Sequence, residues 1–143
     1  MPEAELIFFY GTLMLPYPTL ERLGVERMLA YQGWDAVAGR LYSLGRYPAL
    51  TLGPGSVRGQ VFQMLDPAAL AVLDRFEDYR PDDPNGSEYM RKLLPLTGRE
   101  ASAWVYVFNR PTDGLPPLAG GDWAALQGQP QAWDDFFASR TVE

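Results

Sequence analysis

The sequence contains neither cysteine nor histidine, and its only lysine is Lys92. Without cysteine the chain has no disulfide, no zinc–thiolate centre and no cysteine nucleophile. Without histidine it has neither a Ser-His-Asp triad nor a histidine-ligated metal. An enzyme built from this chain must therefore move protons with Asp, Glu, Tyr, Lys or Arg side chains. We expect its site to hold no metal and no cofactor.

Long apolar runs and an excess of positive charge are also missing. No apolar stretch approaches the ~20 residues that cross a bilayer, and the acidic start, MPEAEL, is untypical of a secretory signal. The net charge of −6 disfavours nucleic acid as a partner. With 143 residues, of which 47% are hydrophobic, the chain is expected to be one cytoplasmic domain over 1–143, with no membrane partner. Its oligomeric state is left open.

The hydrophobic pattern predicts several strands and few helices. Gly and Pro make 45–56 rich in turn residues, and helices are too few for repeated βαβ units. We therefore expect an α+β fold, in which a small, mostly antiparallel curled sheet or barrel packs against a few helices. The predicted strands are 5–10, 29–44 (one long or two short), 57–65, 88–96 and 101–108, and the predicted helices are 16–23, 67–79, 121–127 and 130–139.

Glu77 lies on the apolar face of the predicted 67–79 helix, because it follows Leu73 by four residues and Leu70 by seven. A carboxylate near a helix C-terminus meets an unfavourable dipole, and burial also disfavours its charge. Both effects raise its pKa, which suits a general acid or base. In the alternative interpretation, the helix frays before residue 77 and Glu77 reaches solvent.

The segment LIFFYGTLMLP, residues 6–16, predicts a buried strand that stops abruptly at a glycine. Gly11 permits a positive φ and a close approach by a ligand. Successive backbone N–H groups in such a turn form a site for an anion, and Thr12 adds a hydroxyl donor. The alternative is an ordinary turn between a strand and a helix.

Seven short motifs occur in an order that resembles the gamma-glutamylcyclotransferase-like family, over residues 6–123. The motifs are FFYGTL near the N-terminus, YPAL at 47–50, VRGQVFQM at 57–64, LDRFEDY at 73–79, YMRKLLPL at 89–96, AWVYVF at 103–108 and GGDW at 120–123. The resemblance implies a small fold built on a curled, barrel-like mixed sheet, with a pocket beside the N-terminal strand.

The resemblance also implies a reaction and its residues. In the family, the α-amine of a gamma-glutamyl substrate attacks its own γ-carbonyl, which releases 5-oxoproline and an amine. The family's proton-shuttling glutamate corresponds to Glu77. Its substrate-holding loop, which uses backbone amides, corresponds to Tyr10, Gly11, Thr12 and Leu13. The segment after this loop, MLPYP, lacks the basic or glycine residue that many relatives carry, so the resemblance does not identify the substrate.

Tyr89 and Arg91 form the family's YxR element and point to one face of a predicted strand. Arg91 could bind a substrate carboxylate, pair with Glu77 or form a surface salt bridge. Tyr106, on the next strand, is expected either in the core or lining the pocket. Competing functions are a noncatalytic small-molecule binding domain of the same fold and an enzyme that removes gamma-glutamyl protection from a biosynthetic intermediate.

Overall fold

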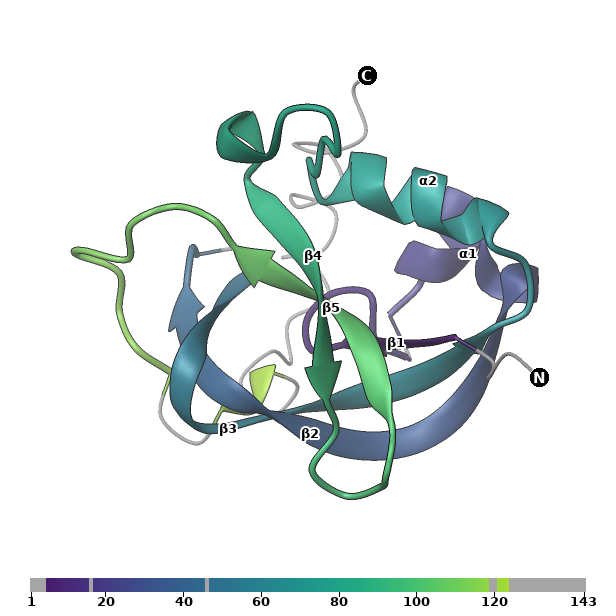
Figure 1. Cartoon of the computed structure of the whole chain (residues 1–143), viewed down its shortest axis with the longest axis horizontal. Coiled ribbons are helices and arrows are strands. Elements are labelled where there is room, and N and C mark those ends of the chain that lie inside the picture. Colours follow the sequence, from purple (N-terminus) through teal and green to yellow (C-terminus); the bar gives the residue numbers. More distant parts are fainter. Residues whose placement is uncertain (1–4, 16, 46, 119–120, 124–143) are drawn as a thin grey trace.

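The computed structural model describes residues 5–15, 17–45, 47–118 and 121–123. Within them, one mixed sheet has the strand order β2-β3-β1-β5-β4. The strands are β1 (Leu6–Phe9), β2 (Leu29–Ser43), β3 (Pro48–Met64), β4 (Tyr89–Pro95) and β5 (Ser102–Phe108). The helices are α1 (Thr19–Leu23) and α2 (Ala68–Phe76), with short 3₁₀ helices η1 (Glu26–Met28) and η2 (Pro84–Gly86). The predicted α+β class with a curled sheet is confirmed. Figure 1 shows the long β2–β3 ribbon below the shorter strands and α2 above them.

Strand β1 occupies the centre of the sheet. Its apolar sequence, LIFF, suits this position, since Ile7, Phe8 and Phe9 are buried. It pairs antiparallel with β3 on one side and parallel with β5 on the other, where Ile7 is opposite Trp104. The end of β1 therefore lies between two strands from distant parts of the chain.

Strands β2 and β3 form a long hairpin, and the prediction of turns over 45–56 was wrong for most of that stretch. Strand β3 begins at Pro48 and continues through the glycines to Met64. Gly53 and Gly55 have positive φ values of 149° and 120°, and the register with β2 shifts nearby, between Ala38 and Arg40. The glycines thus bend a continuous strand, as they do at bulges, and do not end it.

The predicted helix 67–79 is shorter than expected. It ends at Phe76, because Asp78 adopts a left-handed φ of 56° and the backbone turns away. Asp tolerates this conformation better than most residues. The helices predicted at 121–127 and 130–139 lie outside the described residues, except for 121–123. No helix within the described ranges is both long and apolar enough to cross a membrane.

The turn between β4 and β5 is fastened to the far edge of the sheet, which helps the sheet to curl. The Asp35 carboxylate of β2 accepts hydrogen bonds from the amides of Ala36 and Gly98, each at 2.7 Å, and from Arg99 Nε at 2.8 Å. Burial raises the pKa of Asp35, but these donors and the Arg99 charge outweigh it and hold the pKa below its usual value. We name Asp35, Gly98 and Arg99 the Asp35 clasp.

The Asp35 clasp is expected to weaken in acid. A folded-state pKa below the unfolded value contributes stability that is complete above pH ~4, the unfolded pKa. That contribution is lost as the pH falls from there through the lower folded pKa. Urea denaturation should therefore show Asp35→Asn much less stable than wild type at pH 7, with the difference shrinking towards pH 3. The exposed Asp82→Asn should follow wild type throughout. A constant difference for Asp35→Asn would contradict the prediction.

Candidate active site

A small cavity lies where β1 ends, with a volume of about 30 Å³. A space of ~10–15 Å³ admits one water molecule, so this cavity holds about two. Its walls come from four strands, the loop after β1 and the end of α2. The lining residues are Phe8, Phe9, Tyr10, Gly11, Thr12, Leu13, Pro48, Glu77, Tyr89 and Tyr106.

One wall is the turn at Gly11–Leu13. The amide of Met14 donates to the carbonyl of Gly11 at 3.1 Å, which closes the turn. Within the described residues, the backbone N–H groups of Gly11, Thr12 and Leu13 donate to no protein acceptor. Gly11 also lies against a ring, because a Cβ there would come within 2.8 Å of Pro48 Cγ. The turn thus offers backbone donors at a place where only glycine fits.

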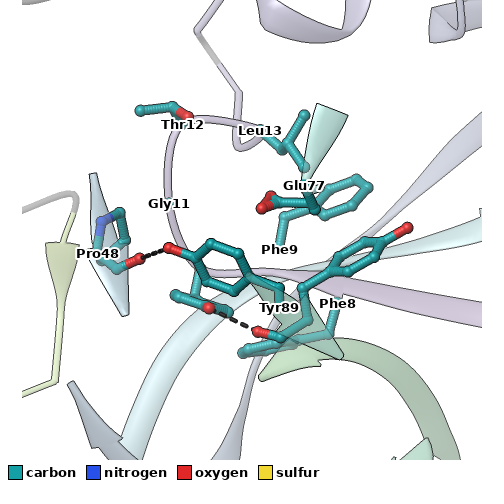
Figure 2. Close-up of a pocket in the computed structure, with 10 residues that line it drawn as sticks. Phe8, Phe9, Gly11, Thr12, Leu13, Pro48, Glu77 and Tyr89 are labelled. Atoms are coloured by element: carbon teal, nitrogen blue, oxygen red, sulfur yellow. Dashed lines mark hydrogen bonds between the residues drawn. The ribbon is translucent and has the colours of Figure 1, made fainter. Parts of the chain in front are cut away.

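Glu77 forms the opposite wall, directly after the last residue of α2. Its amide still donates to the Leu73 carbonyl at 2.9 Å, so the helix fixes where the side chain starts. Glu77 is half-buried. Figure 2 shows its side chain pointing into the space between the Gly11–Leu13 turn and the ring of Tyr89. Glu77 and the three residues of the turn therefore line one cavity.

Two buried tyrosines hold the walls together. The hydroxyl of Tyr89 donates to the carbonyl of Pro48 at 2.8 Å, and that of Tyr10 donates to the carbonyl of Tyr106 at 2.6 Å. Burial raises the pKa of Tyr10 well above its usual value, and the nearby charge of Glu77 raises it further. Tyr10 is therefore a neutral hydrogen-bond donor at physiological pH.

Arg91 lies beside the cavity and pairs with Asp74 of α2. Its Nε and Nη2 contact the two Asp74 oxygens at 2.9 and 3.2 Å, and its guanidinium stacks 4.6 Å from the Trp104 ring centre. Burial lowers the pKa of Arg91, yet the hydrogen bonds and charge of Asp74 raise it above its usual value. Tyr106 also donates to Asp74, at 2.7 Å. Burial raises the Tyr106 pKa, as do the charges of Asp74 and Glu77.

The structure brings most of the predicted site residues together. Those that line the cavity are Glu77, Tyr10, Gly11, Thr12, Leu13 and Tyr89, whereas Arg91 is not among the lining residues. From the sequence, Tyr106 was expected either in the core or lining the pocket; in the structure it is buried and also lines the cavity. Sequence reasoning gave no role to Pro48, Phe8 or Phe9. Within the described ranges, no three His, Cys, Asp or Glu side chains group as metal ligands.

Sequence comparison identifies relatives along most of the chain. Residues 7–125 match the family described as "Gamma-glutamyl cyclotransferase, AIG2-like". The Escherichia coli (strain K12) protein "Gamma-glutamylcyclotransferase family protein YtfP" is 43% identical over 117 residues, which cover 82% of this chain and 94% of the relative.

Solved structures of related proteins have the same fold. The solution structure of ytfP from Escherichia coli superposes with a TM-score of 0.63 at 35% identity, covering 83% of this chain and 96% of that one. The crystal structure of an AIG2-like protein from Mus musculus superposes with a TM-score of 0.66 at 22% identity, covering 91% of this chain and 93% of that one. At that identity the likeness supports the fold alone.

Proposed function

Because the chain belongs to the gamma-glutamyl cyclotransferase, AIG2-like family, we propose that it is a cyclising enzyme acting on a small gamma-glutamyl amine or peptide. In this reaction the substrate's α-amine attacks its own γ-carbonyl. The new C–N bond closes a five-membered lactam, the original amide C–N bond breaks, and 5-oxoproline and an amine leave. No atom of the protein enters the product.

One observation carries the proposal: a half-buried carboxylate and a turn with free backbone donors line the same cavity. Glu77 would take a proton from the substrate ammonium, which makes the amine nucleophilic, and later give it to the leaving nitrogen. The amides of Gly11–Leu13 would bind the negative charge that develops on the γ-carbonyl oxygen.

The remaining walls would shape the substrate. The aromatic residues Tyr10, Tyr89 and Tyr106 exclude water and favour a folded glutamyl chain, in which the amine lies close to the carbonyl. A cavity that holds about two water molecules must widen when such a group enters. The nucleophile comes from the substrate, so the chemistry needs no Ser, Cys or His of the protein, no metal and no cofactor.

Two alternatives share the fold. A noncatalytic binding domain would use the same backbone donors for an anion, but the Glu77 carboxylate in the same cavity would repel that anion. An enzyme that removes gamma-glutamyl protection would follow the same chemistry and differ only in its leaving amine. The cavity therefore favours a reaction over simple anion binding.

The test is a panel of gamma-glutamyl amines and peptides, with 5-oxoproline measured by mass spectrometry. At least one member should yield 5-oxoproline together with its free amine. The same compound acetylated on its α-nitrogen should yield none, because the nucleophile is blocked. If no member of the panel is converted, the binding domain becomes the better interpretation.

A further inference from the structure

Two buried polar side chains hold the loop that follows β1. The Thr19 hydroxyl, on the first residue of α1, donates to the carbonyl of Thr12, and Thr19 is 0% exposed. Gln60 of β3 is 3% exposed. Its Oε1 accepts from the Leu15 amide at 2.6 Å, and its Nε2 donates to the Leu15 carbonyl at 2.9 Å. Neither Thr19 nor Gln60 lines the cavity.

The Thr19 bond determines which way one backbone donor points. A trans peptide is planar, with its C=O and the following N–H on opposite sides. Since the Thr12 carbonyl turns towards Thr19, the N–H of Leu13 turns the other way. The Gly11 carbonyl faces Met14 in the same manner, which directs the N–H of Thr12 outwards. Thr12 and Leu13 both line the cavity (Figure 2). Thr19 is not among the lining residues.

Gln60 fixes the far side of the loop. A primary amide carries both a donor and an acceptor, so Gln60 satisfies both backbone groups of Leu15 as a neighbouring strand would. Gln60 lies opposite Phe9, the last residue of β1, in the sheet register. The loop that begins after Phe9 thus returns to the same place on β3, and its backbone cannot slide without breaking two partly buried hydrogen bonds.

We propose that Thr19 and Gln60 are positioning residues, which aim the Leu13 N–H at the oxygen that becomes negatively charged in the reaction. The inference rests on the proposed function for the identity of that oxygen. Both residues act through the backbone and touch no substrate. Their bonds exist before substrate arrives, so the donor needs no reorganisation when charge develops.

The effect should appear in kcat. Deleting a donor of this kind outright lowers kcat by ~10²–10³. Thr19→Val keeps the shape of the side chain and leaves the donor present but loosely held, so kcat should fall by ~10-fold to 100-fold while KM changes less than ~3-fold. Thr19→Ser keeps the hydroxyl and should retain most of the wild-type kcat. Gln60→Met, which loosens the loop from the other end, should lower kcat in the same way.

Thr97→Val is the matched control. Thr97 also donates its hydroxyl to a carbonyl, that of Ala36 at 3.2 Å. It follows β4, whose opposite end carries Tyr89 in the cavity wall. Its kcat and KM should match those of wild type.

A second measurement needs no substrate. In ¹⁵N relaxation of the free protein, order parameters for the Thr12 and Leu13 amides should fall from ~0.85 towards ~0.6 in Thr19→Val, and stay high in Thr19→Ser and Thr97→Val. Unchanged order parameters in Thr19→Val, or equal losses of kcat in Thr19→Val and Thr19→Ser, would overturn the proposal. If wild type makes no 5-oxoproline but the order parameters fall, the loop is positioned as inferred and the proposed function fails instead. Should Thr19→Val not fold, Gln60→Met decides by the same two measurements.

Discussion

Glu77→Gln is expected to lower 5-oxoproline formation by ~10²–10⁴ in kcat, the range that general acid–base catalysis contributes. The amide has nearly the shape of the carboxylate, so the half-buried side chain should keep its place after α2. It cannot accept the ammonium proton, however, and the substrate amine then stays protonated and unreactive. Steady-state kinetics with the best substrate of the panel would measure the loss.

Two companion variants sharpen this prediction. Glu77→Asp keeps the carboxylate but withdraws it by one methylene, and its kcat should lie between those of wild type and Glu77→Gln. Glu26→Gln makes the same chemical change at an exposed position in η1, outside the cavity, and should leave kcat unchanged. If Glu77→Gln retained a kcat within a few-fold of wild type, with unchanged thermal stability, another group would have to move the proton.

Arg91→Met is expected to cost about 3–5 kcal/mol of unfolding free energy. The Asp74 and Arg91 side chains are only 11% and 15% exposed, so the substitution would leave a buried carboxylate without its cation. Methionine fills much of the same volume beside Trp104, which keeps the packing loss small. Urea denaturation at pH 7 would measure the change.

A double variant separates charge from packing. Asp74→Leu together with Arg91→Met removes both charges, and stability should recover in part, because an isolated buried charge no longer destabilises. The remaining loss reflects the buried Tyr106 hydroxyl, which no longer has Asp74 as its acceptor. Arg80→Met is the matched control: its pair with Asp78 is 56% and 41% exposed, and such a pair contributes about 1 kcal/mol or less. Equal losses in Arg91→Met and in the double variant would show that packing dominates.

The sequence predicted strands correctly where the hydrophobic pattern continued without glycine or proline. The apolar LIFF run marked β1, and the strands predicted at 88–96 and 101–108 match β4 and β5 to within about one residue. The pattern misled at 45–56, because Gly53 and Gly55 bend a strand as readily as they end one. It also extended α2 beyond Phe76, since only the left-handed turn at Asp78 shows where the helix stops.

The site was predicted unevenly for a related reason. The helical spacing from Leu70 and Leu73 is enough to predict that Glu77 faces inwards. That prediction needs no knowledge of the neighbouring strands, so it could be made from the sequence. The partner of Arg91 could not be read in this way, because Asp74 and Glu77 are one turn apart on the same side of the helix. Only the folded structure shows that Arg91 of β4 pairs with Asp74. Likewise, the hydrogen bond from Thr19 to the Thr12 carbonyl depends on how the loop after β1 folds back. The spacing of hydrophobic residues does not predict that path.

The central place of β1 has a consequence for synthesis on the ribosome. Residues 6–9 emerge early, yet one neighbour spans 48–64 and the other 102–108. Such long-range pairing is slow to form. A nascent chain therefore carries an unfilled backbone edge on β1 until β5 has been made, and the cavity lacks part of its wall before Tyr106 is added. The cavity should consequently close only after β5 has left the ribosome, when β1 acquires its second neighbour.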